Sequence, residues 1–187
     1  AGITSATLAG HMAVSKLAEG HAGYLRALDS FAEIIPAAAE MLRRWFIGKN
    51  GPLGIPLYSH GSHQPKRVWS TIFGSFAVTY LSGEGHDQPV GVNVLEKVQI
   101  PHLEELVGVL LATTLRAKDA LTFIIAGAGL PWQFPQALTS LARDREAEYL
   151  VDVLEGQDGA EKRATRPERF NLVELVKTFS AETRARL

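Results

Sequence analysis

Cysteine is absent from this 187-residue chain, which excludes a disulfide framework, a thiolate metal site and a cysteine nucleophile. An excess of one charge is also missing, because 19 basic residues stand against 20 acidic ones. A surface that neutralises nucleic-acid phosphates needs a basic excess, so we expect no nucleic-acid partner. No apolar run reaches the roughly 18 residues of a membrane span, so we expect no membrane partner and a cytoplasmic location.

Three common nucleotide and hydrolase motifs are missing as well. The sequence has no G-x-G-x-x-G after a strand, no G-x-x-x-x-G-K-[ST] and no G-x-S-x-G, which argues against Rossmann, P-loop and α/β-hydrolase proteins. The hydrophobic content of 46% is enough for a buried core, so we treat residues 1–187 as a single segment. No metal is predicted, because the six histidines lack the spacing of a metal site: His11, His21, His60, His63, His86 and His102.

The first half of the chain is predicted to be helical. Apolar residues recur at helical spacing from Ala9 to Phe46, and Pro36 is expected to separate two helices there. A long loop rich in glycine and proline is expected over 48–65. The run 76–81 is rich in strand-forming residues but also fits a helix that begins near residue 69. The pattern alone does not decide between the two.

Two short apolar runs are typical of buried parallel strands. They span 90–95 and 120–125, and the second leads into the small residues at 126–129. A helical stripe follows each run, over 103–111 and 134–141. This alternation of strand and helix predicts an α/β fold with parallel strands, arranged as a sheet or barrel with right-handed crossovers.

The C-terminal third is less regular. A strand is possible over Tyr149–Leu154, and a loop is expected over Gly156–Pro167. The last stretch, Asn171–Leu187, contains a short apolar cluster and a polar end, and no chemistry is assigned to it.

Candidate ligand-binding residues gather where the predicted parallel strands end. In a parallel barrel, ligands lie at the carboxyl ends of the strands. The three strand ends carry small or polar residues at 4–7, 93–97 and 127–129. A flat flavin ring needs small residues near its face and polar groups at its edge. The alternative is structural, because glycine pairs are common in turns into helices and asparagine often caps a helix.

His86 is the one histidine considered for catalysis, and only as a weak candidate. Its neighbours Glu84 and Asp87 are carboxylates that would raise the pKa of its ring and orient it. The alternative is a structural turn in which Asp87 caps and His86 packs.

Several blocks of the sequence resemble the amino-terminal half of the nitronate monooxygenases, also called 2-nitropropane dioxygenase-like proteins. The longest block, Gly83–Gln99, reads Gly-Glu-Gly-His-Asp-Gln-Pro-Val-Gly-Val-Asn-Val-Leu-Glu-Lys-Val-Gln. Shorter blocks occur in the same order and at similar spacing, at 20–31, 42–46 and 126–131. In weaker form the resemblance covers nearly the whole chain.

The resemblance implies an FMN-dependent (β/α)8 TIM-type barrel that oxidises alkyl nitronates, its small-molecule substrates, with molecular oxygen. On this basis Ser5 and Thr7 would approach the flavin. Asn93 and Lys97 would form hydrogen bonds with it. Gly127, Ala128 and Gly129 would leave room for its ring.

The departures from the family pattern predict a partial barrel. The family's first strand would precede Ala1, and its C-terminal half, with the catalytic histidine and the phosphate loops, would follow Leu187. The catalytic residue is therefore unknown. The open sheet edges of a partial barrel predict a homo-oligomer. Two rival hypotheses stay open, a related FMN-dependent enoyl reductase and a non-catalytic scaffold derived from a barrel.

Overall fold

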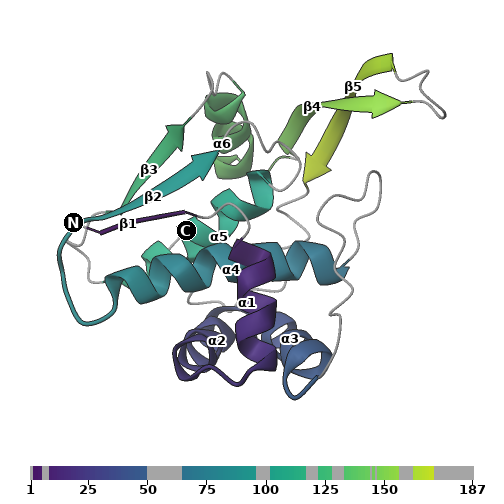
Figure 1. The fold of residues 1–187 in the computed structure, drawn as a ribbon. Helices are drawn as coiled ribbons and strands as arrows, with labels where there is room; N and C mark the ends of the chain where they lie inside the picture. The colour runs from purple at the N-terminus through teal and green to yellow at the C-terminus, as the bar shows by residue number, and fades with distance from the viewer. Residues whose placement is uncertain are drawn as a thin grey trace.

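The computed structural model describes residues 2–5, 9–49, 65–95, 102–116, 122–127, 133–143, 145, 147–155 and 162–170 (Figure 1). Its helices and strands follow in the order β1 (Gly2–Ser5), α1 (Ala9–Ala18), α2 (Ala22–Ile34), α3 (Pro36–Phe46), α4 (Pro65–Gly83), β2 (Val90–Leu95), α5 (His102–Thr114), β3 (Thr122–Gly127), α6 (Phe134–Ala142), β4 (Ala147–Glu155) and β5 (Lys162–Phe170).

The helical first half contains one more helix than the sequence pattern predicts. Pro36 does separate two helices, because it occupies the first turn of α3, where its missing N–H costs nothing. A second break falls at Gly20, whose φ of 71° lies in the left-handed region that ends helices. Helix α1 therefore ends before α2 begins. The predicted loop over 48–65 lies largely outside the described residues, which resume at 65.

The ambiguous run 76–81 is helical, as part of α4. Two hydroxyl groups that are buried in this part of α4 form hydrogen bonds within the helix. Ser75 Oγ donates to the carbonyl of Thr71 at 2.9 Å, and Thr79 Oγ1 donates to the carbonyl of Ser75 at 2.7 Å. Each buried hydroxyl is satisfied within its own helix, so α4 can be buried along most of its length.

A parallel three-stranded sheet, in the order β1-β2-β3, lies over α4 and α5 (Figure 1). Val90, Val92 and Val94 alternate along β2 and are fully buried in the core beneath the sheet. The opposite face carries Phe123 and Ile125 of the edge strand β3, with 53% and 41% of their surfaces exposed. The two faces of the sheet are therefore covered unequally.

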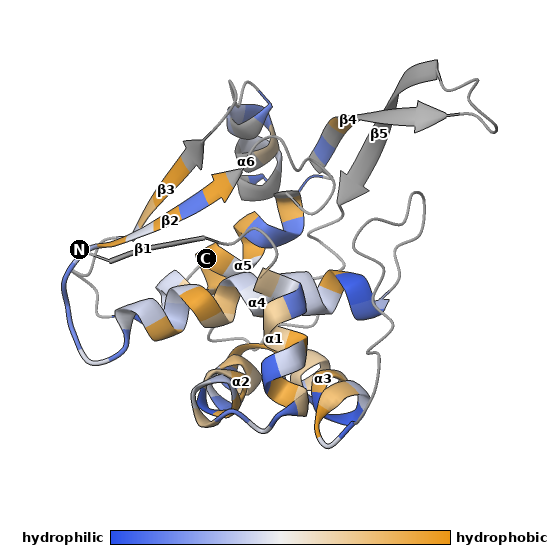
Figure 2. Ribbon diagram, in the orientation of Figure 1, coloured by the Kyte–Doolittle hydropathy of each residue, from blue (hydrophilic) through white to orange (hydrophobic). Residues whose placement is uncertain are grey.

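Helix α4 is the central element of the helical layers, and it packs against α1, α2, α3, α5, β1 and β2. Figure 2 shows the alternation of hydrophobic and hydrophilic residues along these helices. Two glycines let neighbouring backbones approach α4. A Cβ on Gly74 would strike the backbone of Ala9 and Gly10 in α1, and a Cβ on Gly108 of α5 would strike Ile72 O and Ser75 Oγ.

A two-stranded antiparallel hairpin, β4-β5, extends from the parallel part of the molecule (Figure 1). The strand predicted at Tyr149–Leu154 lies within β4. The loop predicted over Gly156–Pro167 is wrong in its second half, because β5 begins at Lys162. Extended pairing with β4 outweighs the polar composition of β5, which had suggested a loop.

The structure confirms a mixed, helix-rich α/β fold with a parallel sheet. The strands predicted at 90–95 and 120–125 correspond to β2 and β3, the latter shifted to Thr122–Gly127. Among the described residues, no helix has both the length and the apolarity needed to cross a membrane.

Candidate functional site

The parallel register brings three of the predicted ligand-binding residues to one end of the sheet. Ser5 on β1 pairs with Asn93 on β2, and Asn93 pairs with Ile125 on β3. Gly127 ends β3 two residues further on, opposite Leu95. Because all three strands are parallel, their carboxyl ends meet at this edge. The sequence prediction that these residues are neighbours is consistent with the backbone.

Asn93 is the most informative residue at this edge. Its side chain alternates with the fully buried Val92 and Val94, so it extends from the face of the sheet opposite α4 and α5. Its Oδ1 atom is buried and has no hydrogen-bond partner among the described residues. A buried acceptor without a donor costs about 1–3 kcal/mol. Such a cost is expected where a ligand supplies the missing donor.

Four other predicted ligand-binding residues cannot be placed. Thr7, Lys97, Ala128 and Gly129 lie outside the described residues. The same holds for His60 and His63.

A buried ion pair joins the first turns of α4 and α5, which begin on the same side of the sheet as the carboxyl ends of the strands. Arg67 Nη2 donates to Glu104 Oε1 at 3.0 Å, and both side chains are only 6% exposed. The Nε and Nη1 atoms of Arg67 are buried and have no partner among the described residues. The pair therefore ties two helices together, while two guanidinium nitrogens have no partner in the part of the chain that the structure describes.

Glu105 lies next to this pair and is also buried, with 1% of its surface exposed. Its Oε2 atom has no hydrogen-bond partner in the described part of the chain. Burial, and then repulsion from the neighbouring Glu104, raises the pKa of Glu105 to about 8. Glu105 is consequently a neutral acid at neutral pH, able to donate a proton.

Sequence reasoning missed Arg67, Glu104 and Glu105. Two acidic residues in the first turn of a helix are usually explained by the helix dipole, so the Glu-Glu pair carried no signal. One clue was available in the sequence. Apolar residues follow Glu104 and Glu105 almost without interruption, so α5 has little polar surface and its two acidic residues are expected to be buried. Partial burial also lowers the pKa of His11 in the first turn of α1, which the spacing of histidines could not indicate.

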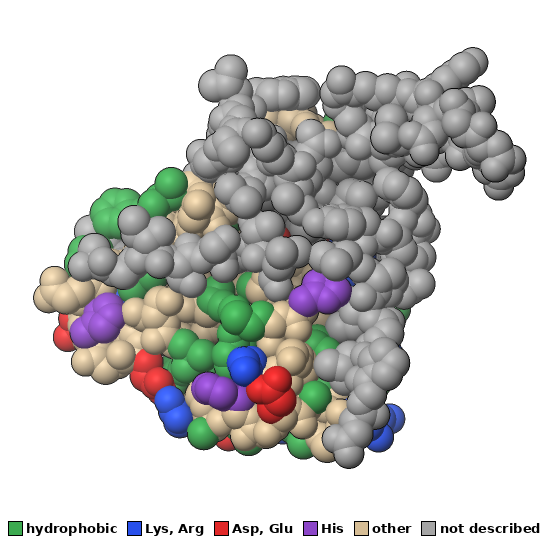
Figure 3. Space-filling model, in the orientation of Figure 1, with side chains coloured by type: hydrophobic (Ala, Val, Ile, Leu, Met, Phe, Trp, Pro, Cys, Tyr) green, Lys and Arg blue, Asp and Glu red, His purple; other side chains and the backbone are tan. Residues whose placement is uncertain are grey.

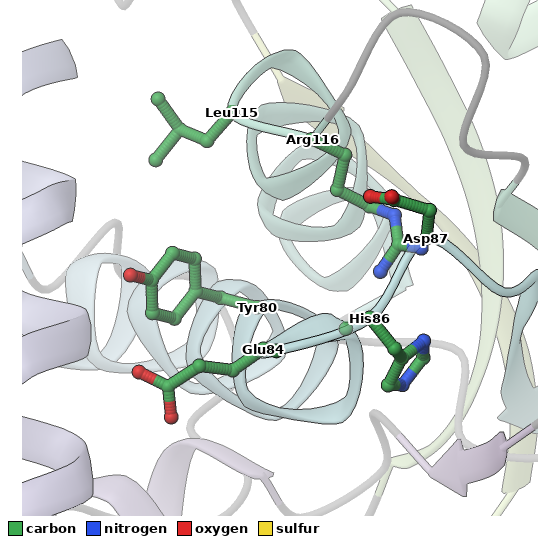
Figure 4. A pocket seen from close by; sticks show the side chains of 8 residues that line it. Tyr80, Glu84, His86, Asp87, Leu115 and Arg116 are labelled. Carbon is green, nitrogen blue, oxygen red and sulfur yellow. The ribbon is translucent and has the colours of Figure 1, made fainter.

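His86 lies at the other end of the strands, in the turn between α4 and β2 (Figure 4). The turn lines a cavity of about 360 Å³ together with Tyr80, Leu115 and Arg116. Gln88 N–H donates to His86 Nδ1 at 3.1 Å, and Nε2 lies 2.8 Å from the carbonyl of Ser82. Both contacts are satisfied by the neutral ring that carries its proton on Nε2.

The rest of this turn is also held by its own contacts. Arg26 donates twice to the carboxylate of Glu84, at 3.0 and 2.7 Å, and Arg116 Nη2 donates to the carbonyl of Gln88 at 2.8 Å. Gly85, with φ of 81°, supplies the left-handed bend. Because both ring nitrogens of His86 are engaged, the structural explanation of this residue is favoured over the catalytic one. The sequence predicted that the carboxylate of Glu84 would lie beside the ring. In the structure this carboxylate is instead paired with Arg26 of α2.

Near the carboxyl edge, the described residues thus place an amide oxygen without a partner among them on one face of the sheet, and a buried ion pair and a neutral acid in the helices on the other face. The described residues include no group of three or more histidine and acidic side chains that could hold a metal ion. Comparison of the chain with protein-family models, curated proteins and solved structures gave no match.

Proposed function

We propose that the chain forms part of an FMN-dependent TIM-type barrel oxidoreductase of the nitronate monooxygenase kind, working in the cytoplasm. Its reaction would be the oxidation of alkyl nitronates with molecular oxygen. The single observation that carries the proposal is the Oδ1 of Asn93, which is buried at the carboxyl end of a parallel sheet and has no hydrogen-bond partner in the described part of the chain.

The strand order supports the barrel part of the proposal. The three parallel strands follow one another as β1-β2-β3 without reversal, whereas doubly wound nucleotide-binding sheets reverse their order. Right-handed crossovers between strands in such an order place the connecting helices on the same face. Helices α4 and α5 cover the face of Val90 and Val92. In the proposed barrel, the opposite face, which carries Asn93, would line the interior.

The residues at this edge fit a flavin in chemical type. The isoalloxazine ring carries an imide N–H, which is the kind of donor that Asn93 Oδ1 lacks. Gly91 precedes Asn93 on the same face and has no side chain to obstruct a flat ring. Ser5 and Gly127 lie on the two neighbouring strands. FMN would accept the electrons of the substrate, and the role of this chain's residues would be to orient the ring and exclude water.

The test is an equilibrium titration of the purified chain with FMN, followed by flavin fluorescence. We expect saturable binding that Asn93→Ala weakens by about 1–3 kcal/mol, because the flavin donor loses its acceptor. Without flavin, Asn93→Val should stabilise the fold by about 1 kcal/mol, since it removes a buried unsatisfied oxygen and adds a strand-forming side chain. Opposite effects on binding and stability would mark Asn93 as a ligand-binding residue.

Asp87→Asn is the matched control, because Asp87 is exposed in the turn at the opposite end of the strands. It should change neither flavin affinity nor stability measurably. Equal affinity of the parent and Asn93→Ala for FMN would contradict the proposal and favour the non-catalytic scaffold. Nitronate-dependent oxygen consumption by the flavin-loaded protein would then distinguish a monooxygenase from an enoyl reductase, which requires a nicotinamide donor.

A further inference from the structure

Strand β3 (Thr122–Gly127) forms one edge of the parallel sheet and is open on both of its faces. Phe123, Ile124 and Ile125 are 53%, 36% and 41% exposed. Because successive residues of a strand point to opposite faces, these exposures cannot come from one uncovered face alone. Val92, which pairs with Ile124 in the register, is fully buried on the neighbouring strand β2. The exposure therefore belongs to the edge strand rather than to one face of the sheet.

The outer edge of β3 has none of the features that keep edge strands from pairing. Residues 122–127 read Thr-Phe-Ile-Ile-Ala-Gly, without a charged residue or a proline. The strand pairs with Val90–Leu95 at consecutive positions, so no bulge interrupts it. In the described part of the chain, only β2 pairs with β3, and no described helix or strand lies beyond its outer edge (Figure 1). Backbone N–H and C=O groups on this side are therefore available to another strand.

The other described strands fit this edge less well than a second copy of β3 does. Strands β4 and β5 pair with each other along their whole length, and both carry charged residues. Strand β1 (Gly2–Ser5) is uncharged but short, and its pairing with β3 of a second copy would be a heterologous contact, which builds an open-ended chain or a ring. A second β3 is uncharged, apolar and of equal length. No like charges would meet across such a pair.

We infer that β3 is a dimerisation edge, at which the β3 strands of two copies pair antiparallel about a two-fold axis perpendicular to the sheet. Such an axis keeps each face of the sheet on the same side in both copies, so only residues of the same face stand opposite each other. With the axis at Ile124, the middle of the three exposed residues, Ile124 lies opposite its own copy and Phe123 lies opposite Ile125 of the second copy. A pair of an aromatic and a β-branched residue is of the kind that stabilises antiparallel strands.

The inference goes beyond the proposed function, and it gives the homo-oligomer expected from the sequence a definite edge, register and symmetry. A segment that completes the proposed barrel would pair with the same edge and displace the second copy, so the dimer is the state of the chain on its own. The dimer is measured without flavin, whereas the proposed function is measured by the flavin titration. The two can therefore fail separately.

The first experiment uses the absence of cysteine from the chain, which allows a single introduced cysteine to report one contact. Ile124→Cys is compared with Ile47→Cys, because the two isoleucines are similarly exposed, at 36% and 37%, and Ile47 lies at the end of α3. Under mild oxidation, Ile124→Cys should form a disulfide dimer at least about tenfold faster than Ile47→Cys, since directly opposite positions on paired strands lie within disulfide reach. Non-reducing electrophoresis measures both rates. Equal rates would overturn the inference.

The second experiment tests the edge without a cross-link. Analytical ultracentrifugation of the parent chain should show a reversible equilibrium between monomer and dimer at micromolar concentration. Ile124→Lys places like charges opposite each other at the axis, so it should raise the dimer dissociation constant at least about tenfold, while Ile47→Lys should leave it unchanged. Circular dichroism checks that both variants are folded. A parent that stays monomeric, oligomers larger than a dimer, or an Ile124→Lys variant that is as dimeric as the parent would each contradict a two-fold contact through β3.

Discussion

The two faces of the parallel sheet differ in how well neighbouring elements cover them. On the helix side, Val90, Val92 and Val94 are fully buried beneath α4 and α5. On the other side, Phe123 and Ile125 expose about half of their surfaces, and Asn93 buries an oxygen that no described residue contacts through a hydrogen bond. Figure 3 shows hydrophobic side chains at the surface where Figure 1 places β3.

This difference separates residues that maintain the fold from residues that are available for function. Parallel sheets normally have both faces covered, because their strands are apolar on both sides. Beneath β2 the helix side already meets that requirement through close packing, so substitutions of Val90, Val92 and Val94 should cost stability. The other side does not, so substitutions there should affect a ligand or a covering segment while leaving the folded chain largely intact.

The largest expected effect comes from closing the approach of α1 to α4. Gly74→Ala places a Cβ against the backbone of Ala9 and Gly10, which cannot move aside as a flexible side chain could. We expect a loss of about 3 kcal/mol or more in the free energy of unfolding, even though alanine favours helix by about 1 kcal/mol. Urea denaturation followed by circular dichroism measures this loss.

Gly23→Ala in α2 is the matched control, since this glycine is also buried and helical. A Cβ there would meet the His21 ring at 3.3 Å, and an exposed ring can turn away. Stability should stay the same or rise slightly. Equal losses at Gly74 and Gly23 would show that the close helix contact is not what holds the helix side together.

An intermediate effect should follow from placing a hydroxyl on each face in turn. Val92→Thr buries a polar group where the parent residue is fully buried, at a cost of about 1–3 kcal/mol. Ile125→Thr introduces a polar side chain at a position that is 41% exposed, so the loss in the free energy of unfolding should stay below about 1 kcal/mol. Thermal denaturation of the two variants measures both losses of stability. A larger loss for Ile125→Thr than for Val92→Thr would contradict the difference between the two faces.

The smallest global effect is expected at the junction of α6 with the hairpin. Gln133 Nε2 donates to the carbonyl of Leu150 at 3.0 Å, and Gln133 Oε1 accepts from the Leu150 N–H at 2.6 Å. Gln133→Leu should accelerate amide exchange at Leu150 in NMR while the global midpoint of unfolding changes little, because the hairpin opens locally. Gln136 is exposed on α6, so Gln136→Leu should leave the exchange rate of the Leu150 amide unchanged.

The elements with strong local signals were predictable from the sequence. The bounds of β2 agree with the apolar run 90–95, and α5 contains the predicted stripe 103–111. At the site, Ser5, Asn93 and Gly127 were expected to meet, and the strand register supports this grouping. The predictions of β2 and α5 succeeded because hydrophobic periodicity is a property of neighbouring residues in the chain, whereas the ligand-binding role of the three site residues stays a prediction.

What could not be predicted depends on long-range packing. The burial of Arg67 and Glu104 requires two helices to meet across 37 positions of sequence. The outcome for the run 76–81 was decided by burial of α4 between the sheet and α1–α3, which local propensity does not contain. The strand β5 depends on its partner β4, and a proline within it obscured the pattern. Pro167 is tolerated because it pairs with Leu150, whose N–H and carbonyl are directed to Gln133 and away from β5.

The central position of α4 has a consequence for synthesis of the chain. Helices α1, α2 and α3 are translated first, yet each of them packs against α4, which is complete only at Gly83. At about 5–20 residues per second, the nascent helices wait for seconds before their partner leaves the ribosome. During that interval Phe31 lacks the rings of Phe73 and Phe76 that enclose it in the finished fold. The apolar surfaces of the first three helices therefore stay without their α4 partner until α4 emerges.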